Sequence, residues 1–224
     1  EIKPNKNIIE KPKVRLVTLS ETKKLYHLDK YAQLPQLSLT FPTVEQFSKD
    51  SYALNTLGEL LSDGRNSVFY KEIIEKQKLA PSASAYNYSS EIAGQFSMSV
   101  RANPNTSLND IYGAIIQSLE NFEKNGVSDN DLKRIKAGQE TAFYNSISTN
   151  LSKARQLGFY NEYAGDPGFV STDIANILSV TKEDVMRVYN KYIKNQHAVI
   201  LSIVPKSQPE LILNDSEEAH VKEE

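Results

Sequence analysis

The spacing of apolar side chains changes in blocks along the chain, and the order of these blocks constrains the fold more than any other feature. Alternation with a period of two is typical of a strand with one buried face, whereas an apolar stripe with helical spacing is typical of an amphipathic helix. The strand-like blocks are residues 14–19, 37–41, 83–88, 96–101 and 198–204. The helical blocks are residues 52–61, 68–74, 108–122, 132–143, 173–178 and 185–192.

Three of the expected helices begin with the same capping signal. A Ser or Thr is followed three positions later by Asp, in the pairs Ser107/Asp110, Ser128/Asp131 and Thr181/Asp184. This is a carboxylate variant of the capping box, which satisfies backbone N–H groups in the first helical turn. Between the strand-like blocks 83–88 and 96–101, a polar link with Gly94 predicts an antiparallel hairpin. The order of elements predicts an α+β domain, with helices packed on one face of a largely antiparallel sheet.

Composition argues against several classes of partner and chemistry. The chain has 26 Lys and Arg residues against 28 Asp and Glu, a formal net charge of −2, so nucleic acid and acidic membranes are not expected as partners. It contains no Cys, which removes thiol catalysis, disulfides and cysteine metal sites. No run approaches the roughly 18 to 20 apolar residues of a membrane helix, so no membrane insertion is expected.

Short motifs for catalysis are missing as well. His27, His197 and His220 lie too far apart in the sequence to form a local metal-binding motif. The sequence has no phosphate-binding loop, no dinucleotide fingerprint and no nucleophile elbow. We therefore expect no catalytic, cofactor-binding or metal-ligating residue in this segment.

The two ends of the chain differ in charge from its body. Residues 1–13 carry a net charge of +2, residues 205–224 carry −4, and prolines punctuate both stretches. These shifts predict a linker over 1–13, a single domain over 14–204 and an acidic linker or tail over 205–224. Because the sequence starts at Glu1 without an initiator Met, we expect it to be a segment of a longer chain.

Four residues are candidate contacts with a peptide or a neighbouring domain. Arg65 and Ser67 follow the turn at Gly64, where helical N–H groups and a guanidinium suit a carboxylate; a local cap is the alternative. Tyr86 and Tyr88 share one face of the predicted hairpin, whose edge can accept an extended peptide. Cross-strand packing is the alternative for these two tyrosines.

Carboxylates support a different class of function, a hydrolase that works without metal. The acidic residues considered are Glu59, Asp63, Glu72, Glu75 and Glu91. They fall at helix ends or on helix faces, where solvated charge is the simpler interpretation. No motif groups them into a catalytic pair.

Several segments combine in an order that is typical of one protein family. They are Gln33–Thr43 (QLPQLSLTFPT), Leu57–Ser67 (LGELLSDGRNS), Phe69–Ala80 (FYKEIIEKQKLA), Ala85-Tyr86 with the hairpin, the helix pair from Ser128, Ala164–Pro167 (AGDP) and Val180–Val185 (VTKEDV). Together they resemble the pitrilysin/insulinase family of zinc metallopeptidases. The resemblance covers about residues 30–204.

The resemblance implies the fold of a mitochondrial-processing-peptidase-like metallohydrolase domain. The catalytic domain of this family binds zinc through an inverted motif, H-x-x-E-H. This sequence lacks the motif. It resembles the non-catalytic second domain that follows the catalytic domain in this family, so zinc is expected in the catalytic domain of a longer parent peptidase. The family's Arg and Tyr that complete the active site would fall near Ile74 and Pro81, and neither role carries over.

Two functional hypotheses follow from this resemblance. The first is a non-catalytic domain, inactive alone, that contacts neighbouring domains of the same chain and helps to shape the chamber for the parent's peptide substrate. The alternative is a stand-alone, catalytically inactive peptidase-like subunit for peptide binding or assembly. The sequence does not fix a compartment; a periplasmic or exported location follows if the parent carries an upstream signal peptide.

Overall fold

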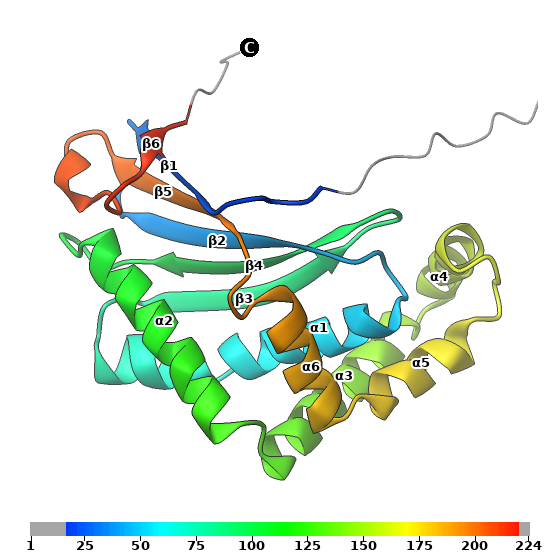
Figure 1. The fold of residues 1–224 in the computed structure, drawn as a ribbon. Helices are drawn as coiled ribbons and strands as arrows, with labels where there is room; N and C mark the ends of the chain where they lie inside the picture. Colours follow the sequence, from blue (N-terminus) through cyan, green and yellow to red (C-terminus); the bar gives the residue numbers. More distant parts are fainter. Residues whose placement is uncertain (1–16, 220–224) are drawn as a thin grey trace, which may run out of the picture.

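A six-stranded sheet forms the centre of the molecule in the computed structural model, which describes residues 17–219 (Figure 1). The strands are β1 (Lys23–Asp29), β2 (Gln36–Thr43), β3 (Ser82–Ser89), β4 (Gly94–Arg101), β5 (Val199–Pro205) and β6 (Glu217–Glu218). Their order in space is β3-β4-β2-β5-β1-β6. The β3–β4, β4–β2 and β2–β5 pairs are antiparallel, whereas β1 lies parallel to β5 and to β6.

Helices cover one face of this sheet, the lower face in Figure 1. They are α1 (Lys49–Ser62), a π-helix (Tyr70–Lys76), α2 (Leu108–Asn125), α3 (Asp129–Ser146), α5 (Val170–Ser179) and α6 (Lys182–Tyr192). Helix α4 (Asn150–Tyr163) stands beside the sheet, and a short 3-10 helix (Pro209–Leu211) follows β5 near β6 (Figure 1). The predicted α+β fold, with helices on one face of a largely antiparallel sheet, is confirmed.

The alternation in β2 separates the two faces of the sheet. Leu37, Leu39 and Phe41 are at most 5% exposed and belong to the hydrophobic core under the helices. Successive side chains of a strand point to opposite faces, so Ser38 and Thr40 lie on the face without helices. There they contact hydroxyls of β4, at 3.1 and 3.3 Å. One face is therefore the core, and the other carries a row of hydroxyls.

The first strand lies later than the sequence predicted. Residues 14–16 of the predicted run lie outside the described residues, and residues 17–19 form no strand. β1 begins instead at Lys23 and pairs with β5 along all 7 of its residues. A strand is fixed by its backbone partner in the folded sheet, and this pairing outweighs the β-propensity of a short apolar run.

The residues after β5 pack against the domain. Leu211 and Leu213 are buried and belong to the core. β6 pairs with β1, and the Ala219 N–H donates a hydrogen bond to the Tyr26 carbonyl at 2.8 Å. The predicted linker or tail over 205–224 thus contains, up to Ala219, residues that contact the sheet. Residues 220–224 and the predicted linker over 1–13 lie outside the described residues.

Hydroxyl caps begin α2, α3 and α6, as predicted. Ser107, Ser128 and Thr181 each accept a hydrogen bond from a backbone N–H of the first turn. The complete capping box with a carboxylate forms at α6, where Asp184 accepts from the Thr181 N–H at 3.1 Å. At α3 the Ser128 hydroxyl donates to the Asp131 carboxylate at 2.6 Å instead. The sequence signal therefore located the helix starts, but the full box forms at one of the three.

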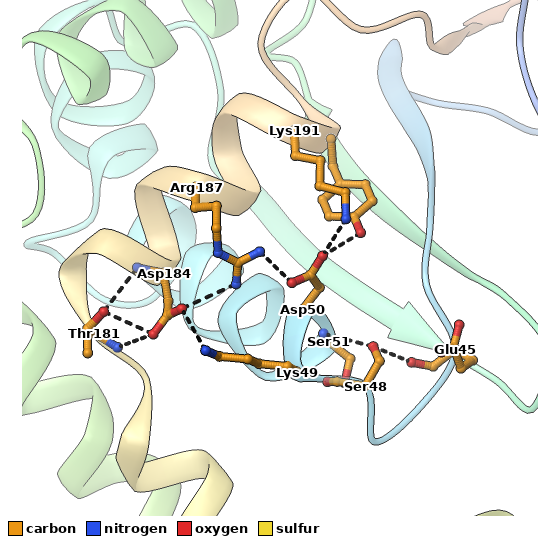
Figure 2. Close-up of polar contacts among 10 residues, drawn as sticks. Glu45, Ser48, Lys49, Asp50, Ser51, Thr181, Asp184, Arg187 and Lys191 are labelled. Carbon is orange, nitrogen blue, oxygen red and sulfur yellow. Dashed lines mark hydrogen bonds and ion pairs between the residues drawn. The ribbon is translucent and has the colours of Figure 1, made fainter.

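An ion-pair cluster joins the beginning of α1 to α6 (Figure 2). The Asp50 carboxylate accepts hydrogen bonds from Arg187 at 2.5 Å and Lys191 at 2.9 Å. The Tyr192 hydroxyl donates to it at 2.6 Å, and Asp184 binds the other arm of the Arg187 guanidinium at 3.2 Å. Burial alone raises the pKa of Asp50, but the three hydrogen bonds outweigh burial and lower it to about 2.

Replacing Asp50 by Asn should lower the free energy of unfolding by about 1.5 to 3 kcal/mol, since charged hydrogen bonds are lost at a largely buried carboxylate. The pKa of Asp50 is about 2 in the folded protein and that of an unfolded aspartate is about 3.9. The stabilisation is therefore complete above pH 4 or so and disappears as the pH falls through about 2. Urea unfolding of the unsubstituted protein and of Asp50→Asn gives the free energy of unfolding of each. The difference between these two free energies should be smaller at pH 3 than at pH 6.

Asp129→Asn is the matched control, because Asp129 makes an exposed ion pair with Lys182 at 2.8 Å. Exposed ion pairs contribute little to stability, so the free energy of unfolding of this variant should be almost that of the unsubstituted protein. Equal losses in the two variants would contradict the importance of the Asp50 cluster.

Candidate functional site

The edge strand β3 and the helix α1 define one side of a groove. Gly58 of α1 lies so close to β3 that a Cβ atom there would stand 2.9 Å from the Ala85 carbonyl oxygen. Such a close approach requires glycine. The Ser62 hydroxyl donates to the same oxygen at 3.1 Å. Helix and edge strand are therefore held at a fixed separation.

The groove beside β3 contains two cavities that share residues. The first has a volume of about 450 Å³ and is lined by Tyr52, Asn55, Glu59, Ala85, Tyr86, Asn87, Gln139, Ala142, Phe143, Ser146 and Ile177. The second, of about 420 Å³, is lined by Gln46, Phe47, Ser51, Tyr52, Asn55, Asn87, Tyr88, Ser89, Gln156, Phe159, Asp173 and Ile177. Because four residues line both, the cavities are adjacent, and we call them together the β3 groove.

The two candidate tyrosines belong to the strand that borders this groove. Tyr86 lines the first cavity and is 50% exposed, and Tyr88 lines the second and is 61% exposed. Their partners on β4 are Ser97 and Gln95, so neither ring forms an aromatic cross-strand pair. Because Ser97 contacts Thr40 on the face without helices, the two tyrosine side chains point to that face, and their backbone borders the groove. Their part in peptide contact stays a prediction.

Arg65 and Ser67 lie elsewhere, on the turn between α1 and the π-helix. Ser67 is 2% exposed, and its hydroxyl donates to the Gly64 carbonyl at 2.7 Å and accepts from the Tyr70 N–H at 3.4 Å. The Ser67 side chain therefore acts as a local cap. Arg65 is exposed beside it, and neither residue lines the β3 groove.

Glu59 is the carboxylate of the first cavity. Gln139 of α3 donates to Glu59 Oε1 at 2.9 Å and to the Thr56 hydroxyl at 3.3 Å. Burial raises the pKa of Glu59, and the Gln139 hydrogen bond opposes this effect. The nearby charges Asp63 and Arg134 pair with each other at 3.3 Å. Arg134 lowers the pKa of Glu59 from a distance, but no Lys or Arg among residues 17–219 forms an ion pair with Glu59.

The other carboxylates do not join Glu59. Glu72 is 6% exposed and accepts hydrogen bonds from Lys76, Gln77 and Asn121, at 2.8 to 3.3 Å. Burial raises the pKa of Glu72, but the hydrogen bonds from Gln77 and Lys76 lower it further than burial raises it. Glu75 and Glu91 are exposed. Of these four glutamates, Glu59 alone lines the β3 groove.

A buried carboxylate that the sequence did not reveal lines the second cavity. Asp173 of α5 is 8% exposed and accepts hydrogen bonds from the Tyr52 and Tyr160 hydroxyls, both at 2.7 Å. Burial raises the pKa of both tyrosines above its usual range. The sequence signal is a single acid in the apolar stripe of α5, next to Ile174 and Ile177. This cluster ties α4 and α5 to α1.

Metal ligands do not converge in the described part of the chain. Within residues 17–219, no group of three or more His, Asp or Glu side chains is arranged to hold a metal ion. His220 lies outside the described residues. None of the helices in this range combines the length and the hydropathy that crossing a bilayer requires.

Comparison with known proteins identifies the family. Residues 1–139 match the model of the peptidase M16 inactive domain. The chain is 25% identical over 164 residues to the zinc protease PqqE of Helicobacter pylori, covering 70% of this chain and 35% of that protein. The chain therefore belongs to the M16 zinc-protease family as its inactive-type domain. The resemblance to zinc metallopeptidases and the non-catalytic assignment are confirmed.

Solved structures share the fold. A protease from Helicobacter pylori superposes with a TM-score of 0.79 at 21% identity, covering 90% of this chain and 48% of that one. The periplasmic protease PqqL from Escherichia coli gives 0.65 at 13% identity, covering 84% and 21%. The chain thus spans about a third of the curated relative and about half or less of these solved chains.

Tyr160→Phe should loosen α4, because Tyr160 is the buried residue of that helix and its hydroxyl binds Asp173. Loss of a buried hydrogen bond that leaves a carboxylate under-satisfied should cost about 1 to 3 kcal/mol. Hydrogen–deuterium exchange should become faster over residues 150–163 than elsewhere. Tyr163→Phe on the same helix, 36% exposed, is the control and should leave exchange unchanged. Unaltered exchange in Tyr160→Phe would show that the Asp173 cluster does not hold α4.

Proposed function

We propose that this domain forms a non-catalytic wall of the peptide chamber of a larger zinc peptidase, and that an extended peptide segment lies along β3. Membership of the inactive-domain family supports the non-catalytic role. The observation that carries the peptide role is the open edge of β3 beside the β3 groove. Tyr86 and Tyr88 would contact the peptide there.

The backbone of β3 suits the addition of a strand. The Ser62 hydroxyl donates to the Ala85 carbonyl from α1, so this carbonyl points away from β4 but is already bonded at the edge. Alternate residues of an antiparallel strand direct their backbone groups to the same side, so Ala83 and Asn87 direct theirs to the same edge. Main-chain hydrogen bonds to such an edge supply affinity, and adjacent pockets supply specificity.

In this proposal the zinc ion belongs to the catalytic domain of the parent and to no residue of this chain. The relatives named above extend well beyond the matched region, which supports a parent with further domains. Residues 14–204 would form the body of this domain, with residues 1–13 and the acidic end as connections to the rest.

The neighbouring domains of the parent would contact α4 and the end of α3. Tyr144, Leu151 and Leu157 are 52% to 62% exposed, and Tyr160 is the buried residue of α4. In Figure 1, α4 stands beside the sheet rather than under it. Exposed apolar side chains gathered in one region mark an interaction surface.

A periplasmic or exported parent fits one of the structural neighbours, which is a periplasmic protease. The alternative function, a stand-alone inactive subunit that binds peptides or assists assembly, uses the same β3 groove. Mass spectrometry of the native protein, with peptides mapped beyond both ends of this sequence, separates the two functions. A longer chain with H-x-x-E-H supports the first, and a native chain of this length supports the second.

Photo-crosslinking tests the peptide role of β3. With p-benzoylphenylalanine in place of Tyr86, a labelled extended peptide should become attached, because this side chain is exposed on the edge strand and would lie beside a strand added to it. The same group in place of Tyr144 is the matched control, since Tyr144 is 54% exposed but lines neither cavity. Equal labelling at both positions, or none at Tyr86, would contradict peptide binding along β3.

The purified chain should hydrolyse no peptide when zinc is added, because no zinc-binding cluster forms within residues 17–219. Quenched fluorescent peptides incubated with the chain and zinc measure this directly. Zinc-dependent cleavage that persists through repeated purification and is removed by a chelator would overturn the non-catalytic role of the isolated domain.

A further inference from the structure

The first cavity of the β3 groove carries one negative charge. Glu59 is the acidic residue of its lining, and no Lys or Arg lines it. The Gln139 amide fixes Glu59 Oε1, and within residues 17–219 no hydrogen bond reaches Oε2. A half-buried carboxylate without an ion-pair partner is costly, which agrees with the raised pKa of Glu59. The cavity therefore contains a carboxylate whose negative charge is not offset by any Lys or Arg of its lining.

The charges around Glu59 do not supply the missing partner. Arg134 of α3 binds the Asp63 carboxylate at 3.3 Å, so the two offset each other. Asp63 follows the end of α1 and Arg134 lies on α3; both are exposed, and neither lines the cavity. A cation that enters the cavity would meet Glu59 as its nearest unpaired charge.

The walls of the cavity suit the stem of a long cationic side chain. Phe143 lines it with an aromatic ring, and Ala142 and Ile177 add aliphatic surface. Lysine and arginine bury their methylene stems against apolar surface while the charged group reaches a polar partner. Aromatic faces also attract a cation directly. A volume of about 450 Å³ lies within the range of small-ligand sites.

The cavity also adjoins the backbone that a bound peptide would use. Ala85, Tyr86 and Asn87 of β3 line it, and these residues form part of the open edge. In a strand added to that edge, alternate side chains point toward the helix-covered face. One such side chain would enter the first cavity and approach Glu59.

We propose that the first cavity is a subsite for a lysine or arginine side chain of a peptide bound along β3. Glu59 pairs with the cationic head, and the side chains of Phe143, Ala142 and Ile177 pack against its stem. This inference rests on the proposed peptide role of the β3 edge and names the side-chain class that the groove selects.

Fluorescence anisotropy with three matched probes tests the subsite. Labelled, end-capped heptapeptides of alanine and valine carry lysine, arginine or the uncharged lysine isostere norleucine at the central position. The cationic peptides should bind the 224-residue chain about tenfold more tightly than the norleucine peptide, as for a partly buried charged hydrogen bond.

Two variants assign the effect to the cavity. Glu59→Gln keeps the size of the side chain and should bind all three peptides equally. Asn55→Lys places a cation on α1 one turn from Glu59, at an exposed position lining the cavity, and should also remove the preference. Glu75→Gln is the matched control, because Glu75 is exposed and lies outside the groove. Circular dichroism confirms that each variant is folded.

Each outcome has a definite meaning. A preference for cationic peptides that both cavity variants abolish, and Glu75→Gln retains, establishes the subsite. Equal binding of all three peptides overturns the subsite and leaves peptide binding along β3 standing. Binding of no peptide overturns the proposed peptide role of β3, and the subsite falls with it. A preference that survives Glu59→Gln places the cation elsewhere and overturns the assignment to this cavity.

Discussion

The close packing of α1 on the sheet is the contact on which the rest of the molecule depends. Leu54, Leu57 and Leu61 of this helix are fully buried in the core, and Gly58 allows the helix to approach β3 within contact distance of its backbone. The same helix holds Asp50 at its beginning and Glu59 near its end. One helix therefore anchors the core, the ion-pair cluster with α6 and the floor of the groove. Displacing α1 would disturb all three at once, because a close-packed core transmits small shifts.

Local patterns in the sequence predicted most of the fold. Period-two alternation located β2 and the hairpin, and hydroxyl–carboxylate pairs located the starts of three helices. β1 was misplaced because Lys23–Asp29 has little alternation of its own and is specified by pairing with β5, far away in the sequence. What a local pattern cannot supply is a partner from a distant element.

The same limit applies to the candidate site. Tyr86 and Tyr88 were found because both lie on one exposed strand face. The contact between Glu59 and Gln139 joins residues 80 positions apart, and Asp173 meets Tyr52 across 121 positions. Each of these polar residues looks ordinary in the sequence, since its chemistry comes from burial and from partners that only the folded chain assembles. Ser67 is the opposite case. The sequence suggested it as a contact residue, but its hydroxyl is hydrogen-bonded within its own turn.

The pairing of β6 with β1 has a consequence for self-association. A sheet with two bare edges can add copies of itself without end, which is the geometry of fibres. Here β6 occupies the middle of the β1 edge, and the Tyr26 carbonyl there is already bonded to Ala219. The outer edge is now β6 itself, which has 2 residues, both exposed glutamates, and offers little to a further strand. Two copies that met through β3 would therefore tend to stop at a closed, twofold pair. The pairing of β6 with β1 thus limits growth of the sheet to the β3 edge, where one strand or one partner can be added.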